Sequence, residues 1–250
     1  IAIKNNPSFI KDIVEKNKLE IERFDVFDKK IKVSKEKDLI EINGVPFVYH
    51  QLELLEKKGF KNMHFCLGFL GEQVEKVVKE SEYFKRLSIS FSYDGNTLLG
   101  TGGTIRKIIN QLPEYFFVTY GDSYLDIDFN DIQEIFESKK QNYNSLMTVY
   151  KNKDLFDTSN VIFENGLIGL YSKLRKDSRM AHIDYGIGIL SNKSMDIYDN
   201  NIIFDLGELY ENLSLKRELY GYEVFQRFYE IGSLQGIEDL SNYLKIKNKQ

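Results

Sequence analysis

The chain has 250 residues, of which 42% are hydrophobic and 29% charged, the composition of an ordinary globular protein. Its net charge of −4 disfavours nucleic-acid binding, and its single cysteine excludes an intrachain disulfide framework and a cysteine-rich zinc module. The sequence contains neither a run of 18 apolar residues nor a signal-peptide pattern. We therefore expect a protein of a reduced cytoplasm, with no nucleic-acid and no membrane partner.

Glycine is unevenly distributed along the chain. All 17 glycines lie at Gly44 or later, and the first 38 residues carry ten Lys or Arg and eight Asp or Glu. This shift in composition predicts an atypical segment or lead-in at 1–36 and a folded domain at 37–250. Because the chain begins with Ile1 rather than methionine, we expect the native translation start to lie elsewhere.

From residue 39 to residue 136, short apolar runs alternate with segments of helical spacing. Strands are expected at Leu39–Ile42, Met63–Leu67, Leu87–Tyr93 and Tyr115–Tyr120. Helices are expected between Pro46 and Gly59, over Glu72–Lys79, between the glycine loop Leu99–Gly103 and Pro113, and through Phe136 with Asn130 and Gln133 as a capping pair.

The second half is richer in strands. They are expected at Ser145–Tyr150, Asn160–Phe163, Ile168–Ser172, Ile183–Leu190, Tyr220–Val224 and Arg227–Ile231. Asp205 with Glu208 is expected to cap one helix, and Ser233 to open the last. The alternation predicts an α/β fold with a parallel or mixed sheet and helices on both faces.

Asp122 follows the apolar strand that ends at Tyr120. In open α/β sheets, ligands bind beyond the carboxyl ends of the strands, and a carboxylate there can hold Mg²⁺. A simple turn cap is an equally good interpretation. The nearby Asp126-Ile127-Asp128 resembles the Asp-x-Asp of metal-dependent glycosyltransferases, and Asp128 could equally precede the next helix as a surface residue.

The glycine loop before the helix at residue 105 carries three glycines in four positions: Gly100, Gly102 and Gly103 around Thr101. Such a loop lets the backbone approach a ligand, and a helix N-terminus attracts anions. A plain turn rarely needs three glycines, which favours a binding function.

Three further residues have side chains that could take part in chemistry, and we consider each in turn. Glu230 ends a strand between bulky apolar neighbours and could supply a second carboxylate for one Mg²⁺. Cys66 lies in an apolar strand and is expected in the core. His182 precedes a strand, and contact with a substrate is the less favoured interpretation for it.

Taken in order, several segments resemble the bacterial sugar-1-phosphate nucleotidylyltransferases, in particular the heptose-1-phosphate and mannose-1-phosphate guanylyltransferase branch. They are Leu39–Leu55 with Gly68–Glu72, Leu99–Gly103, Val118–Asp128, His182–Gly188 and Glu223–Ser233. The resemblance implies a Rossmann-like three-layer αβα fold with a mixed sheet, of the nucleotide-diphospho-sugar transferase type. It also implies an enzyme that joins an NTP to a sugar 1-phosphate with Mg²⁺ as cofactor, releasing pyrophosphate.

The resemblance also implies roles for individual residues. Asp122 matches a catalytic metal ligand and Glu230 the second acidic ligand, which is usually Asp in the wider family. Gly100, Thr101, Gly102 and Gly103 match the loop at the nucleotide base and ribose. Lys173 matches a lysine near the sugar phosphate, and Asp184 and Gly186 match a strand that borders the sugar.

One defining element of that family is missing from the sequence. Its Gly-Gly-x-Gly-Thr-Arg-Leu loop, whose amides hold the triphosphate, should lie in 1–31, where there is no glycine. A Pro-Lys pair that follows this loop in the family appears here as Glu36-Lys37, which keeps only the lysine. Lys37 could contact a phosphate, or it could be an ordinary surface lysine. Either the protein is a degenerate member, or the sequence omits a segment, or its amino end builds a different phosphate site.

The sequence therefore predicts a nucleotidylyltransferase of nucleotide-sugar and polysaccharide-precursor synthesis, with an NTP and a sugar 1-phosphate as substrates. Two alternatives stay open: a non-catalytic nucleotide- or sugar-binding domain of the same fold, and a metal-dependent glycosyltransferase. The base, the sugar and the choice between a homo-oligomer and a fusion to an upstream domain are also open.

Overall fold

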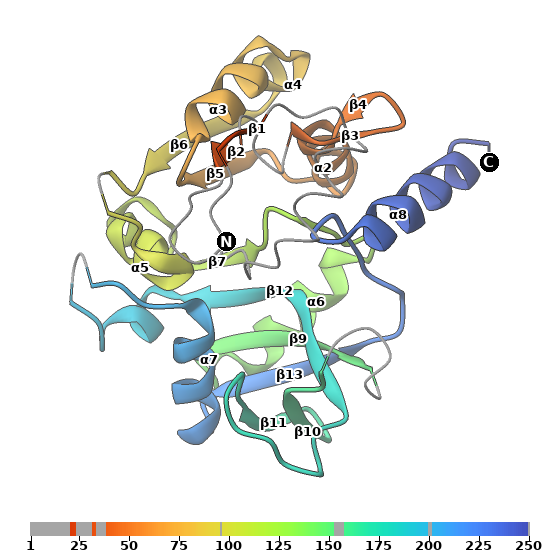
Figure 1. Cartoon of the computed structure of the whole chain (residues 1–250). Helices are drawn as coiled ribbons and strands as arrows, with labels where there is room; N and C mark the ends of the chain where they lie inside the picture. Colours follow the sequence, from red (N-terminus) through yellow and green to blue (C-terminus); the bar gives the residue numbers. More distant parts are fainter. Residues whose placement is uncertain are drawn as a thin grey trace. The chain divides into compact units, whose positions relative to one another are not determined.

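The computed structural model describes residues 21–23, 32–33, 39–95, 97–152, 158–199 and 202–249. The chain forms two compact units, and each unit is made of segments that are not contiguous in the sequence (Figure 1). Unit 1 comprises Ile1–Asn96, Gly121–Tyr124 and Phe228–Gln250, and unit 2 comprises Thr97–Tyr120 and Leu125–Arg227. The expected boundary between 1–36 and 37–250 falls outside the described residues and stays a prediction.

Unit 1 is built from short strands and five-to-fourteen-residue helices. Its strands are β1 (Ile21–Arg23), β2 (Lys32–Val33), β3 (Glu41–Ile42), β4 (Val45–Pro46), β5 (Asn62–Leu67), β6 (Ser88–Tyr93), β8 (Ser123–Tyr124) and β14 (Tyr229–Glu230). Its helices are α2 (Phe47–Lys57), α3 (Gly71–Glu80), α4 (Glu82–Arg86) and α8 (Leu234–Lys247).

The parallel pair β5–β6 has one apolar and one polar face, as the period of two along a strand predicts. Met63, Phe65 and Leu67 point to the face that packs with buried residues of α2 and α3. On the other face, the His64 ring lies 2.8 and 2.9 Å from the hydroxyl groups of Ser90 and Ser92. Cys66 belongs to this second face and is partly exposed, so the expectation of a core cysteine was too strong.

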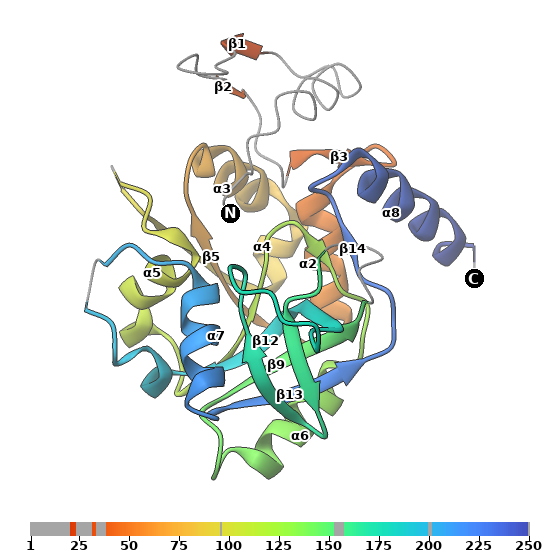
Figure 2. The same ribbon diagram turned by 60° about the horizontal axis from the view of Figure 1, so that its bottom comes forward.

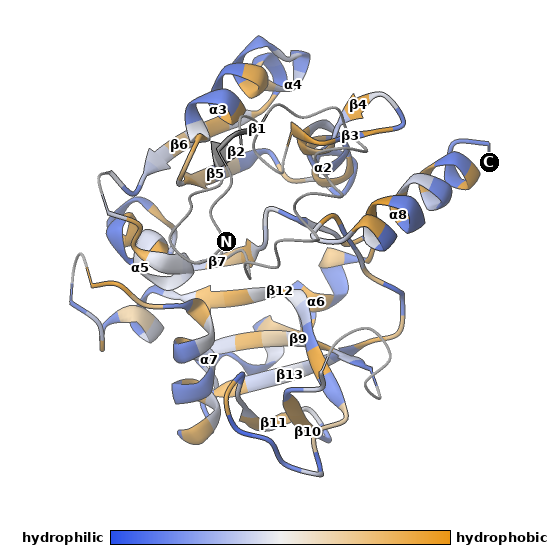
Figure 3. Ribbon diagram, in the orientation of Figure 1, coloured by the Kyte–Doolittle hydropathy of each residue, from blue (hydrophilic) through white to orange (hydrophobic). Residues whose placement is uncertain are grey.

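A second apolar cluster of unit 1 collects residues from both ends of the chain. Ile42 and Phe47 near the amino end pack with Tyr124, and with Leu240 and Leu244 of α8. Apolar and polar residues alternate around α8, as Figure 3 shows, so one stripe of this helix is buried.

Unit 2 contains a six-stranded mixed sheet in the order β10-β11-β13-β9-β12-β7. The pair β13–β9 is parallel, and the other pairs are antiparallel. The strands are β7 (Tyr115–Thr119), β9 (Ser145–Lys151), β10 (Val161–Glu164), β11 (Leu167–Tyr171), β12 (His182–Ser191) and β13 (Leu219–Val224). Figures 1 and 2 show β12, β9 and β13 side by side.

The helices of unit 2 pack on this sheet. They are α5 (Gly100–Lys107), α6 (Phe129–Lys139) and α7 (Leu206–Leu215), with the short 3-10 helices η2 (Ile109–Gln111) and η3 (Asn192–Met195). Helix α6 contacts β9 and β13, and α7 contacts β11 and β13. The observed class is therefore α/β with a mixed sheet, as predicted.

Two local predictions for unit 2 were wrong. The glycines expected in a loop form the first turn of α5, because the Gly102 and Gly103 amides donate to the Phe204 carbonyl. Asp128, rather than Asn130, caps α6, and its carboxylate accepts a hydrogen bond from the Asn130 amide at 2.9 Å. Both differences arise from partners that helical spacing does not reveal.

No helix within the described ranges has the length and apolar character needed to cross a membrane.

Candidate active site

Two carboxylate residues meet in unit 1 although 107 positions lie between them in the sequence. Asp122 immediately precedes β8, and Glu230 ends β14. The two strands pair antiparallel with Glu230 opposite Ser123, and the Ile231 amide donates to the Asp122 carbonyl at 3.0 Å. The pairing thus brings the backbone of both predicted metal ligands together.

Helix α2 also contacts β8, the strand that follows Asp122. The Gln51 side-chain amide donates to the Ser123 carbonyl at 3.0 Å. Tyr124 packs edge to face with Tyr243 of α8, whose ring stacks on Tyr229 at 4.5 Å. The backbone that carries Asp122 is therefore held by α2, β14 and α8.

The Glu230 carboxylate folds back onto the start of α8. Its Oε2 accepts a hydrogen bond from the Gly232 amide, and its Oε1 accepts one from the Ser233 hydroxyl at 2.5 Å. A carboxylate offers about four lone-pair positions, so two stay available on Glu230 for another ligand.

Within the part of the chain that the structure describes, no three His, Cys, Asp or Glu side chains form a metal-binding group. Mg²⁺ that is bound together with phosphates commonly uses only one or two carboxylates and takes its other oxygens from water and substrate, so a smaller set of ligands remains the prediction. Asp122 and Glu230 are the residues that could hold it.

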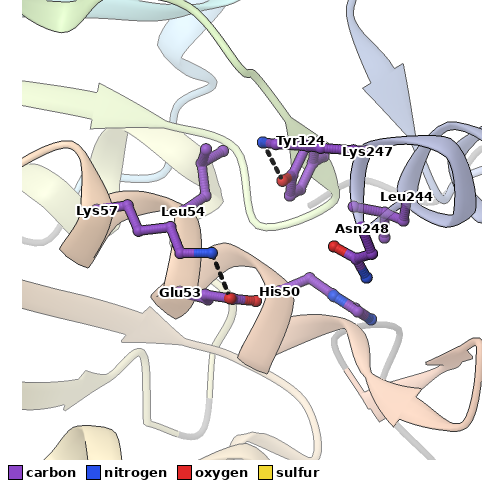
Figure 4. A pocket seen from close by; sticks show the side chains of 8 residues that line it. All are labelled: His50, Glu53, Leu54, Lys57, Tyr124, Leu244, Lys247 and Asn248. Atoms are coloured by element: carbon purple, nitrogen blue, oxygen red, sulfur yellow. Dashed lines mark hydrogen bonds and ion pairs between the residues drawn. The ribbon is translucent and has the colours of Figure 1, made fainter. Parts of the chain in front are cut away.

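Unit 1 also has a small pocket between α2, β8 and α8 (Figure 4). The Lys57 ammonium pairs with Glu53 at 2.6 Å, and the Lys247 ammonium lies 3.4 Å from the Tyr124 hydroxyl. The lining residues are His50, Glu53, Leu54, Lys57, Tyr124, Leu244, Lys247 and Asn248. No predicted site residue is among them.

In unit 2, Lys173 forms an ion pair with Asp205. The Lys173 ammonium lies 2.9 Å from Asp205 Oδ1, and both side chains are partly exposed. Asp205 is the N-cap of α7 and forms the predicted capping box with Glu208. Burial raises the pKa of Asp205, but the hydrogen bonds from Lys173 and the Gly207 amide outweigh it and leave the pKa below its usual range.

Asp184 lies on β12 near the same lysine. Its carboxylate accepts hydrogen bonds from the Tyr120 hydroxyl at 3.1 Å and the Gly186 amide at 2.9 Å. Burial nevertheless raises the pKa of Asp184 to about 6, against the lowering effect of these donors and of the Lys173 charge. Gly186 has φ +106°, a conformation that favours glycine and lets its amide turn toward Asp184.

The glycines of α5 lie against another segment of the same chain, residues 202–204. A Cβ at Gly100 would lie 2.5 Å from the Phe204 carbonyl oxygen, and one at Gly102 would overlap the Phe204 ring. The Thr101 hydroxyl accepts a hydrogen bond from the Leu206 amide at 2.8 Å, next to the Lys173–Asp205 pair. These residues therefore join α5 to the start of α7, and their contact with a nucleotide stays a prediction.

The site residues predicted from sequence fall into two groups. Asp122 and Glu230 belong to unit 1, while Lys173, Asp184, Gly186 and the Gly100–Gly103 turn belong to unit 2. Lys37 lies outside the described residues.

Sequence reasoning missed Tyr120, Ser233 as a partner of Glu230, and Asp205 as a partner of Lys173. Only Ser233, three positions after Glu230, left a local signal.

Two weaker candidates have structural partners. Asp128 caps α6, as described above, which gives half of the Asp-x-Asp pattern a role in the helix. His182 is buried, with Nε2 3.2 Å from Glu223 and its ring against Phe163. Neither observation favours a substrate contact.

Comparison with known proteins shows which enzymes the chain resembles. No protein-family model matches the chain. It is 23% identical over 199 residues to a mannose-1-phosphate guanyltransferase beta-A of Xenopus laevis, covering 78% of this chain and 55% of that protein. It is 26% identical over 167 residues to a D-glycero-alpha-D-manno-heptose 1-phosphate guanylyltransferase of Campylobacter jejuni, covering 66% and 69%.

The chain is a relative of the sugar-1-phosphate nucleotidylyltransferases. This confirms the resemblance found in the sequence, including its heptose and mannose branch. The chain spans about half the length of the Xenopus relative.

Two solved structures share the fold of this chain. The structure of HddC from Yersinia pseudotuberculosis matches with a TM-score of 0.68 at 20% identity, covering 83% of this chain and 89% of that one. A UDP-glucose pyrophosphorylase matches with a TM-score of 0.68 at 15% identity, covering 85% and 91%. Nucleotidyltransferases of this α/β type thus share the fold of the chain.

Proposed function

We propose that the chain is a sugar-1-phosphate nucleotidylyltransferase, which joins an NTP to a sugar 1-phosphate and releases pyrophosphate. The observation that carries the proposal is the pairing of β8 with β14, which sets Glu230 beside the Asp122 loop in a chain related to such enzymes. A phosphate oxygen of the sugar 1-phosphate attacks the α-phosphorus, and the bond to the β-phosphate breaks as pyrophosphate leaves with the electron pair. The protein contributes mainly by positioning two anions and offsetting their charge.

Asp122 and Glu230 would hold Mg²⁺ in this reaction. The ion would neutralise charge on the phosphates, the role for which a hard oxygen-binding cation is suited. The protein's own part is to present two carboxylates on a supported backbone, which the contacts of Gln51 and α8 provide.

On the sugar side, Lys173 supplies a cation and Asp184 an acceptor. A phosphate of the substrate would compete with Asp205 for the Lys173 ammonium, since that pair is partly exposed and costs little to open. Asp184 keeps free lone pairs beside its bonds to Tyr120 and Gly186 and can accept from a sugar hydroxyl.

Several finer features belong to the same proposal. They are a three-layer Rossmann-like arrangement, a cytoplasmic location, Lys37 as a phosphate contact, and nucleotide binding at Gly100–Gly103. The names of the relatives favour GTP with mannose 1-phosphate or a heptose 1-phosphate as the first substrates to test.

A non-catalytic binding domain of the same fold is the second candidate. It is favoured by one observation, the absence of glycine from the first 43 residues, where the triphosphate loop is expected. A metal-dependent glycosyltransferase is less well supported, because Asp128 is engaged as the cap of α6.

The test is pyrophosphate release with GTP, ATP, CTP and UTP against mannose, heptose and glucose 1-phosphates. We expect release with at least one pair, and loss of release in Asp122→Asn by about 100-fold or more, because an interaction with transition-state charge is removed. Nucleotide binding without release for any pair would replace the proposal with the binding domain. Release of a free nucleoside diphosphate from a nucleotide sugar would indicate a glycosyltransferase.

The same assay tests Lys173. Lys173→Ala should raise the KM for the sugar 1-phosphate about tenfold, since a charged hydrogen bond contributes roughly 1.5–3 kcal/mol, and leave the KM for the NTP near its original value. Lys176→Ala, an exposed lysine of the same loop, is the matched control. Equal effects of both variants would contradict a specific role for Lys173.

A further inference from the structure

We propose that Ser233 and Gly236 are positioning residues that hold the Glu230 carboxylate ready for a divalent cation. The inference rests on the proposed function, because it assumes that Glu230 is a metal ligand. It gives Ser233, which the sequence predicts only as the cap of the last helix, and Gly236 a part in the candidate site.

The Ser233 hydroxyl is held by two partners with different roles. It accepts a hydrogen bond from the Gly236 amide at 2.8 Å and thereby caps α8. It also lies 2.5 Å from Glu230 Oε1. Because the hydroxyl has one proton and the Gly236 amide already donates to its oxygen, this proton points to Glu230.

Gly236 provides the space in which the carboxylate lies. A Cβ at this position would overlap both Glu230 Oε1 and the Glu230 carbonyl oxygen. The first turn of α8 therefore sits directly on Glu230, with no side chain between them. We call Gly232, Ser233 and Gly236 the carboxylate notch.

The carboxylate notch restricts a side chain that is otherwise flexible. A glutamate loses up to about 2 kcal/mol of conformational entropy when it is fixed in one rotamer. Here the Gly232 amide and the Ser233 hydroxyl fix it during folding, so a cation does not have to order it on binding. Partners of this kind commonly change metal affinity by about 10- to 100-fold when they are removed.

The length of the glutamate side chain makes this arrangement possible. The side chain reaches back to the Gly232 amide two residues on and to the Ser233 hydroxyl three residues on. Both bonds leave one acceptor position free on each oxygen.

The experiment measures binding of Mn²⁺ alone to the full chain by electron paramagnetic resonance of the free ion. Mn²⁺ prefers the same oxygen ligands as Mg²⁺. The variants are Ser233→Ala, Ser233→Thr, Glu230→Gln, Asp122→Asn and the control Ser81→Ala. Ser81 caps α4 in the same unit and accepts from the Phe84 amide at 3.3 Å, so its loss removes a helix cap but no contact with Glu230.

We expect Ser233→Ala to weaken Mn²⁺ binding about tenfold, and Ser233→Thr to restore it because the hydroxyl is kept. Both serine-to-alanine variants should lower stability to a similar degree, since each removes one cap. Ser81→Ala should leave Mn²⁺ affinity unchanged.

The variants distinguish the metal-binding role of Glu230 from the positioning role of Ser233. If Glu230→Gln and Asp122→Asn weaken binding while Ser233→Ala does not, the metal site stands and the positioning role is overturned. If the chain binds no Mn²⁺, or binds it equally in Glu230→Gln, Glu230 is only a partner of α8, and both the metal role and the inference are wrong.

Discussion

At the scale of single residues, Asp184 is a carboxyl group in an unusual environment. Its carboxyl group is buried beside Tyr120, and burial raises its pKa to about 6 although two donors and Lys173 favour the charged form. Perturbed carboxyl groups of this kind are more frequent at functional sites than elsewhere. Burial of this carboxylate destabilises its charged form, and a role in substrate binding would explain why a carboxylate occupies this position.

This cost predicts a dependence of stability on pH. The folded-state pKa lies above the ordinary value, so between about pH 4 and pH 6 the folded state binds a proton that the unfolded state has lost. Stability contributed by this group is therefore complete below pH 4 and is lost as the pH rises through 6. Asp184→Asn does not titrate and keeps the shape of the side chain.

We expect the unfolding free energy of the original chain to fall relative to Asp184→Asn between pH 4 and pH 7, by at most about 3 kcal/mol. Urea unfolding of both proteins at each pH measures this difference. If the unfolding free energy of the original chain stays constant or rises relative to that of Asp184→Asn as the pH increases, the carboxyl group is not destabilised by burial.

At the scale of elements, the first turn of α5 is built around its glycines. The Gly102 and Gly103 amides donate to the Phe204 carbonyl at 3.0 and 3.2 Å, and the Phe204 ring stacks on Tyr198 at 3.8 Å. The segment 202–204 therefore takes the place of a capping side chain for this helix. Gly100 and Gly103 are required because the backbone of residues 202–204 approaches them closely, and Gly102 is required because the Phe204 ring lies against it.

Gly102→Ala tests this account. Alanine should stabilise an exposed helix by up to about 1 kcal/mol relative to glycine, but here its Cβ would overlap the Phe204 ring. We expect a net loss of about 1–3 kcal/mol, the usual cost of overpacking, measured by thermal or urea unfolding.

Gly169→Ala is the matched control in the same unit. A Cβ at Gly169 would make an ordinary contact of 3.4 Å with Ile162, so a small effect is expected. If Gly102→Ala proves as mild as this control, close packing against Phe204 does not explain the glycine at position 102.

At the scale of the whole molecule, the apolar clusters found among the described residues each draw on one unit. The core of unit 2 draws on residues between Ile105 and Leu219, whereas a cluster of unit 1 combines Ile42 and Phe47 with Ile231, Leu240 and Leu244. Unit 1 therefore depends on residues from both ends of the described chain.

Deletion of residues 228–250 should affect the two units differently. It removes β14 and α8, and with them three of the eight buried residues of that cluster of unit 1, whereas no residue of the unit 2 core cluster is lost. We expect amide hydrogen exchange to become fast in α2 and to stay slow in β9, β12 and β13. Loss of protection in those three strands as well would show that unit 2 does not fold without these residues.

Much of the fold follows from local sequence patterns. The strands β5, β9 and β12 and the helices α3 and α7 lie within a few residues of their predicted bounds, because apolar periodicity and local caps specify them. The Asp205–Glu208 box and the Ser233 cap were predictable for the same reason, since each joins residues at most three positions apart.

The tertiary structure decided what local patterns do not contain. Only strand pairing brings Glu230 to the Asp122 loop, and only packing shows that Gly102 contacts Phe204 or that Lys173 pairs with Asp205. These contacts join residues 32 to 108 positions apart, so no spacing in the sequence encodes them. The sequence by itself therefore determined much of the element order, the α/β class and the resemblance to sugar-1-phosphate nucleotidylyltransferases. The tertiary structure decided which distant residues lie together and which glycines are required by close packing, because both depend on contacts between segments far apart in the chain.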